Sequence, residues 1–143
     1  MRYHEDDPRR LIARLAVAVM IADGRITPDE RDALERLDRL GLGPLVALAQ
    51  EEIERAVREP VDMQATCAGL GDVGPQGAAR ILAVLAEIAA SDRSVLPREV
   101  ATLNAIARLM GLTAPEMDEI LRVTMSARGA GFATAGVEVE ATP

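Results

Sequence analysis

Two segments of this chain carry the same pattern of residues. Residues 23–30 read DGRITPDE and residues 92–99 read DRSVLPRE, so that Asp, a branched apolar residue, Pro and Glu recur at matching positions. An apolar run precedes each segment, and an amphipathic run follows it. This duplication, with an offset of 69 residues, predicts two related helix–turn–helix repeats and places matching carboxylates in each half of the chain.

The composition favours an all-α fold. A chain of 143 residues is long enough for one domain, and its apolar residues are mainly Leu, Ile, Val, Ala and Met, with aromatic residues at only 1%. Alanine-rich segments favour helices, and few stretches show the alternating, β-branched character of strands. We therefore expect a single-domain bundle of six or seven helices, built from two pseudo-symmetric helix–turn–helix repeats.

The predicted domain covers residues 8–125, with one repeat over about residues 8–58 and the other over about residues 76–125. Glycine and proline in residues 71–75 predict a break between the two halves. Gly, Ala and Thr dominate residues 126–143, which we expect to form a disordered tail.

Local signals predict where several helices begin. Thr27 with Glu30, and Thr113 with Glu116, have the spacing of a capping box, in which each side chain accepts a hydrogen bond from the backbone N–H of the other residue. In the second copy Leu96 replaces the capping threonine, so that box is broken. Its proline and glutamate remain and still favour a helix start.

Apolar residues at helical spacing predict which helix faces are buried. A short helix is expected over residues 61–70, and the central helix of the second half over residues 80–90. The residues expected to face inward are Leu11, Ile12, Leu15, Val19 and Ile21; Leu34, Leu37 and Leu40; Leu45, Ala49, Ile53 and Val57; Ile81, Leu82, Leu85 and Ile88; and Val100, Leu103, Ile106 and Met110.

The composition excludes several classes of function. The chain has no lysine, which excludes a P-loop and a lysine nucleophile. A net charge of −7 and the scarcity of aromatic side chains argue against nucleic-acid binding. His4, the only histidine, lies in a polar segment, and Cys67, the only cysteine, lies in an apolar setting that favours a buried structural role. We therefore expect no enzymatic activity.

The repeated acidic turn is the candidate site. Asp23 and Asp92 each follow a predicted helix, where the negative end of the helix dipole disfavours a carboxylate. One interpretation is structural, because the first N–H groups of the next helix are donors for such carboxylates. The other is a site for a divalent cation such as Ca²⁺ or Mg²⁺, held by Asp23, Glu30, Asp92 and Glu99, with Glu87 as an additional ligand.

The turn does not match an EF-hand loop. Residues 23–30 fit positions 5–12 of such a loop, but Val19 and Ile21 fall on positions 1 and 3 and carry no oxygen ligand. The second copy also has Arg93 in place of the glycine at position 6. For Glu87, the alternative to a role as ligand is a place on a partly solvated helix face.

Residues 22–30, followed by a leucine-rich helix and repeated later in the chain, resemble the motif of the TerB-like family of tellurite-resistance proteins. The same domain type is found at the start of certain membrane-anchored J-domain co-chaperones. The resemblance covers about residues 8–125 and implies an all-α bundle, no established enzymatic activity and a role in stress-response assemblies near the membrane. The family's acidic residues are candidate metal ligands, and the matching positions are Asp23, Glu30, Asp92 and Glu99.

Two hypotheses for the function follow. We predict a non-enzymatic helical interaction or scaffold module whose acidic surface docks a protein partner, in a stress-response assembly of the tellurite-resistance type. The alternative is a divalent-cation-binding module that uses the repeated acidic turns. No apolar run is long enough to span a membrane, so we expect a cytoplasmic protein, peripheral to the inner face of the membrane where its partner is membrane-associated. Neither nucleic-acid binding nor direct membrane insertion is expected.

Overall fold

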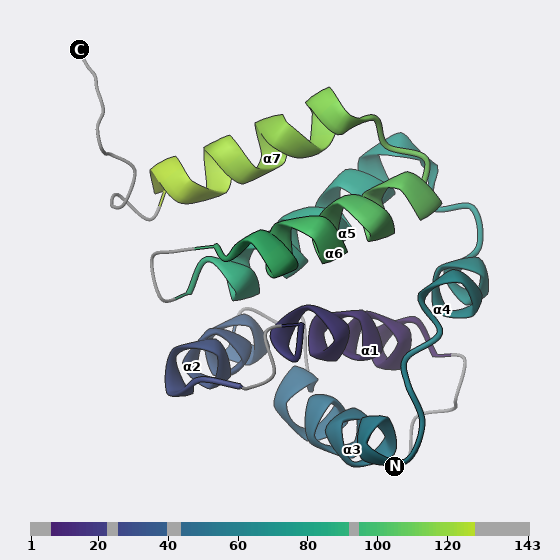
Figure 1. Cartoon of the computed structure of the whole chain (residues 1–143), viewed down its shortest axis with the longest axis vertical. Coiled ribbons are helices and arrows are strands. Elements are labelled where there is room, and N and C mark those ends of the chain that lie inside the picture. The colour runs from purple at the N-terminus through teal and green to yellow at the C-terminus, as the bar shows by residue number, and fades with distance from the viewer. Residues whose placement is uncertain (1–6, 23–25, 40–43, 92–94, 128–143) are drawn as a thin grey trace.

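The computed structural model describes residues 7–22, 26–39, 44–91 and 95–127. Over these residues the chain forms seven α-helices and no strand, which confirms the predicted all-α class (Figure 1). None of the described helices is long and apolar enough to cross a membrane. The helices are α1 (Pro8–Met20), α2 (Pro28–Leu37), α3 (Leu45–Arg58), α4 (Met63–Leu70), α5 (Gly74–Ala89), α6 (Pro97–Leu109) and α7 (Ala114–Ala127).

Two apolar helices, α1 and α5, contact each other at the centre of the bundle. α3 packs against α1, and α7 packs against α5 (Figure 1). Contacts also cross between the halves, because α6 packs against α1 and α2 packs against α5. α4 packs against α1 and α6 and has no counterpart among the described residues of the second half. These pairings fit the predicted duplication, while a regular twofold relation between the halves stays a prediction.

The end of α6 and the start of α7 follow the local signals in the sequence. Gly111 has a φ of +88°, a left-handed conformation that favours glycine after a helix. Glu116 Oε1 accepts a hydrogen bond from the Thr113 N–H at 2.7 Å, and Thr113 Oγ1 accepts one from the Glu116 N–H at 3.2 Å. The predicted capping box is therefore present at the start of α7.

Most of the residues predicted to face inward are buried: Leu11, Leu15, Val19, Leu34, Leu37, Leu45, Ala49, Ile81, Leu82, Leu85, Ile88, Leu103 and Ile106. Ile12, Ile53, Val100 and Met110 are half-buried, whereas Leu40 lies outside the described residues. The prediction was wrong for Val57, which is 83% exposed, and for Ile21, which is exposed just after α1. Residues four apart on a helix differ by about 40° around its axis, so a stripe extended to Val57 rotates away from the core.

α5 begins earlier in the chain than the sequence pattern predicts. The helix begins at Gly74, although the sequence pattern placed its start at Arg80. Pro75 suits the first turn of a helix because it has no N–H to satisfy, and Asp72 Oδ1 accepts a hydrogen bond from the Gly74 N–H at 3.0 Å. The non-helical residues between α4 and α5 are therefore only 71–73. Gly71, which follows α4, and Gly74, the first residue of α5, both have positive φ angles.

α3 receives its N-terminal cap from the end of α2. Pro44, which precedes α3, provides no side-chain hydrogen bond to the helix. Asp38, just after α2, accepts hydrogen bonds from the Leu45 N–H and from the Val46 N–H, the latter at 3.2 Å. This carboxylate satisfies two backbone donors and lies at the positive end of the helix dipole.

Replacing Asp38 tests this cap. We expect Asp38→Ala to lower the free energy of unfolding by about 1–2 kcal/mol, because the two N–H groups lose their acceptor. Asp32→Ala, an exposed position on α2, is the matched control, with an expected change within about 0.5 kcal/mol. Chemical denaturation followed by circular dichroism measures both, and equal effects would contradict the capping role.

Candidate functional site

In both copies of the repeated segment, the glutamate turns back to cap its own helix. Glu30 Oε1 accepts a hydrogen bond from the Thr27 N–H at 2.9 Å, and Thr27 Oγ1 accepts one from the Glu30 N–H at 3.2 Å. Glu99 Oε1 likewise accepts from the Leu96 N–H at 2.9 Å, although the Leu96 side chain has no oxygen with which to complete the box. Both glutamates are only 3% exposed, so helix capping accounts for their position.

Asp23 and Asp92, the aspartates that recur in both copies of the repeated segment, lie outside the described residues. Glu87 pairs with α2, since its Oε2 accepts a hydrogen bond from Arg36 Nη2 at 3.2 Å. Its side chain is partly solvated and links a central helix of one half to an outer helix of the other. Among the described residues, no group of three or more His, Cys, Asp or Glu side chains is arranged to hold a metal ion. Cation binding therefore stays a prediction.

An apolar groove of about 550 Å³ lies beside the first repeated segment. The end of α1, the start of α2 and one face of α3 form its walls, with apolar contributions from Met20, Ile26, Leu34, Val46 and Ile53. Polar side chains border these walls: Thr27, Arg31, Gln50 and Glu54. No local sequence pattern predicts this groove, because its walls come from three helices.

The groove depends on residues of the repeated turn and on a small residue in α3. Ile26, the branched apolar residue of the repeated segment, packs against the core and also lines the groove. Ala49 is buried on the face of α3 that lines the groove, and its single methyl group does not fill the space toward α1 and α2. The same segment that starts α2 therefore also shapes an apolar depression at the surface.

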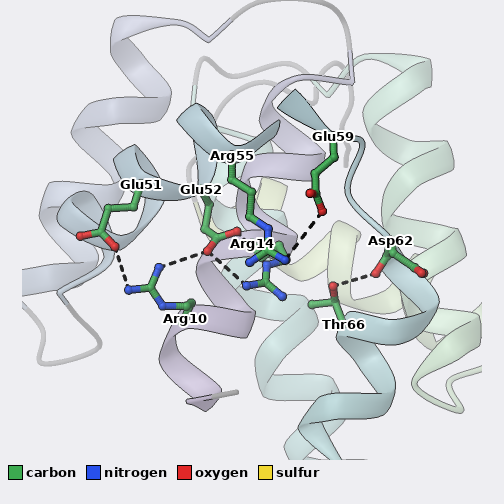
Figure 2. A network of polar contacts seen from close by, with 8 residues as sticks. All are labelled: Arg10, Arg14, Glu51, Glu52, Arg55, Glu59, Asp62 and Thr66. Carbon is green, nitrogen blue, oxygen red and sulfur yellow. Dashed lines mark hydrogen bonds and ion pairs between the residues drawn. The ribbon is translucent and has the colours of Figure 1, made fainter. Parts of the chain in front are cut away.

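A buried cluster of charged residues joins α1 to α3 (Figure 2). Arg14 binds Glu52 through two contacts, from Nε to Oε1 at 2.7 Å and from Nη2 to Oε2 at 3.2 Å. Arg10 donates to Glu52 Oε2 at 3.2 Å and to Glu51 Oε1 at 2.7 Å. The Glu52 side chain is 3% exposed and that of Arg10 is 9% exposed, so these charges are removed from water.

The electrostatics of the cluster keep Arg10 charged. Burial alone lowers the pKa of Arg10, but the hydrogen bonds to Glu51 and Glu52 and their negative charges outweigh burial and raise that pKa above its ordinary value. Next to the cluster, a cavity of about 310 Å³ lies between α1, α3 and α4. Its lining includes Arg14, Glu52 and Thr66, whose side chains are drawn in Figure 2.

The sequence carried a signal for this cluster. Arg10 and Arg14 lie four residues apart on α1, in which all the residues after Arg10 except Arg14 are apolar. Glu52 follows Leu45 and Ala49 along the inward face of α3. Four-residue spacing places two side chains on one face of a helix, and a carboxylate at a core position needs a cationic partner. Opposite charges at predicted core positions of two helices therefore indicate a buried ionic cluster.

Cys67, on α4, is buried. Burial raises the pKa of the Cys67 thiol above its ordinary value, because the apolar surroundings disfavour the charged thiolate. The thiolate is the nucleophilic form, so this environment suppresses nucleophilic chemistry. The structure thus agrees with the expected role of Cys67 as a small buried residue.

Replacing the two capping glutamates separates capping from cation binding. We expect Glu30→Ala and Glu99→Ala each to lower the free energy of unfolding by about 1 kcal/mol, because the Thr27 and Leu96 N–H groups lose their acceptors. Glu30→Gln and Glu99→Gln should lose less stability, since the amide oxygen of glutamine can still accept the hydrogen bond from the backbone N–H. Thermal melting with and without Ca²⁺ or Mg²⁺ measures the effects. A loss that appears only when the ion is present would instead assign these carboxylates to a metal.

The buried cluster gives a second stability prediction. We expect Glu52→Leu to lower the free energy of unfolding by about 3–5 kcal/mol, because it removes the carboxylate that Arg10 and Arg14 share. Arg10→Ala/Arg14→Ala/Glu52→Leu should recover most of this loss, since replacing a whole buried ionic group by apolar residues is often close to neutral. Glu51→Ala, at the exposed end of the cluster, is the control. An equal effect for Glu51 and Glu52 would contradict the assigned burial.

The fold and the repeated segment agree with the comparison of this chain with known proteins. No curated protein and no solved structure matches this chain. The family model described as tellurite resistance protein TerB matches residues 9–122. This range covers the described helices apart from the first residue of α1 and the last five residues of α7. The chain therefore belongs to the TerB family of tellurite resistance proteins.

Proposed function

We propose that this protein is a non-enzymatic interaction module whose groove between α1, α2 and α3 receives apolar side chains of a protein partner. The groove is the observation that supports the proposal. Its volume of about 550 Å³ falls within the range of about 300–1,000 Å³ that is usual for ligand pockets. That space suits a few side chains of a partner segment rather than a whole folded domain.

The arrangement of the groove resembles a small protein interface. Apolar walls from Ile26, Val46 and Ile53 are bordered by the polar side chains of Arg31 and Glu54. Interfaces usually have such an apolar centre and a polar rim, where the rim fixes orientation and the centre contributes most of the binding energy. The groove therefore favours a partner segment with apolar side chains on one face.

The charge of the chain favours a basic partner. A net charge of −7 attracts cationic segments at long range and increases their rate of association. Segments on the cytoplasmic side of a membrane protein are rich in Lys and Arg. A membrane-associated partner with a basic, partly apolar cytoplasmic segment would fit these properties, and with it a location in the cytoplasm beside the membrane. The family name, tellurite resistance protein, supports a role for such a complex in a stress response.

Site-specific crosslinking tests the groove as the docking site. A photoreactive residue replaces Gln50, at the rim of the groove, and the same residue replaces the exposed Val57 on α3 as the control position. In cells of the native host, we expect a specific adduct from position 50 only. Mass spectrometry of the adduct should identify a partner peptide in which apolar residues lie next to Lys or Arg.

A pair of charge substitutions then tests the apolar contact. We expect Ile53→Asp to weaken binding of the purified partner peptide at least tenfold, because it places a carboxylate against the apolar walls. Val57→Asp adds the same charge one turn further along α3 and should bind as the unmodified protein does. Isothermal titration calorimetry measures both. Equal affinities for the two variants would overturn the groove as the docking site.

A further inference from the structure

A second apolar groove lies beside the end of α1. It has a volume of about 450 Å³ and is formed by the end of α1, the linker from α3 to α4 and the first turns of α6. Ile21, Val61 and Met63 contribute apolar side chains, and Ile21 is 36% exposed. We call this depression the α1–α6 groove. Contiguous apolar surface that is open to solvent often marks a place where another segment binds.

One positive charge borders the α1–α6 groove. Arg98 is exposed and is the one charged residue among the described residues that line this groove. Within the described part of the chain, no carboxylate pairs with its guanidinium group. The groove therefore offers apolar contacts together with a cation at its rim. This combination suits a segment that carries both apolar side chains and carboxylates.

A segment of this kind follows α7 in the same chain. Residues 137–140 read VEVE and belong to the part of the chain outside the described residues. In an extended segment, successive side chains point to opposite faces, so the valines lie on one face and the glutamates on the other. When the valines enter a groove, the glutamates stay at its surface, where an arginine at the rim can reach them.

The fold brings this segment toward the α1–α6 groove. Figure 1 shows α6 and α7 running in opposite directions, so that α7 ends at the side of the bundle where α6 begins. Arg98 lies in the first turn of α6. The nine residues 128–136, which separate α7 from the VEVE segment, span up to about 30 Å when extended. This reach exceeds the length of α6, whose 13 residues span about 20 Å.

We propose that residues 137–140 dock in the α1–α6 groove of their own chain, with the two valines against Ile21 and the glutamates beside Arg98. A net charge of −7 repels a separate acidic segment at long range. A segment of the same chain overcomes this repulsion, because a short linker holds it at an effective concentration in the millimolar range. The groove therefore favours the chain's own segment over a separate acidic partner.

The docked segment leaves the groove between α1, α2 and α3 open. Ala18 lines the α1–α6 groove, whereas Met20 lines the groove between α1, α2 and α3. Residues two apart on a helix differ by about 200° around its axis, so the two grooves lie on nearly opposite faces of α1. Docking of residues 137–140 is therefore independent of the proposed binding of a protein partner.

NMR spectroscopy of the full chain tests the docking. We expect nuclear Overhauser contacts between the methyl groups of Ile21 and those of Val137 or Val139, with the same relative intensity at high and low protein concentration. In Val137→Ser/Val139→Ser, the Ile21 methyl signal should shift, because the groove loses its occupant. Ala133→Ser/Ala135→Ser, outside the docking segment, is the control and should leave that signal in place.

Reversal of charges tests the role of Arg98. Arg98→Glu should move the Ile21 methyl signal part of the way to its position in the undocked variant, because like charges then face each other at the rim. Glu138→Arg/Glu140→Arg should do the same, and the combination of all three substitutions should restore the original position. Arg108→Glu, at an exposed position of α6 that does not line the groove, is the control and should cause no shift.

Three results would overturn the proposal. The first is an unmodified protein in which Ile21 makes no contact with residues 137–140. The second is a contact that weakens on dilution, which would assign the occupant to a second copy of the chain. The third is an equal shift of the Ile21 signal in Arg98→Glu and Arg108→Glu.

Discussion

The small size of the core side chains constrains the whole bundle. The described residues include no aromatic side chain, so the core consists of aliphatic residues, methionines and Cys67. α1 and α5 bury several alanines where they pack, among them Ala13, Ala16 and Ala86. The distance between packed helices depends on the side chains at their contact, so alanine allows close approach. The same use of alanine at Ala49 leaves the groove between α1, α2 and α3 unfilled.

Among the described residues, three acidic side chains are buried and serve the fold rather than the surface. Glu30 and Glu99 accept hydrogen bonds from backbone N–H groups at helix starts, and Glu52 binds two arginines across helices. All three are almost fully buried. The total of 23 Asp and Glu residues therefore overstates how many carboxylates a partner meets. The carboxylates of a docking surface belong to exposed residues such as Glu54.

The sequence predicts features that depend on neighbouring residues better than features that depend on packing. The boxes formed by Thr27 with Glu30 and by Thr113 with Glu116 each lie within four consecutive residues, and the structure confirms both. Val57 was assigned to the wrong face because each four-residue step along α3 turns by about 40° around the helix axis, which brings Val57 to the exposed side. The Arg10–Glu52 contact joins residues 42 positions apart, and no local pattern specifies that distance. The metal hypothesis was based on the glutamate that recurs in the repeated segment. Helix capping explains the positions of both copies, Glu30 and Glu99, and requires a glutamate at the same place in the sequence.

One consequence of the packing concerns motion. The chain has a single thiol, and it lies buried on α4, the one described helix that stands outside the repeat pattern. Because Cys67 is only 6% exposed, a reagent added to the native protein reaches that sulfur more readily when α4 separates from α1 and α6. The labelling rate of Cys67 therefore reports how often this helix lifts from the bundle, without any added probe.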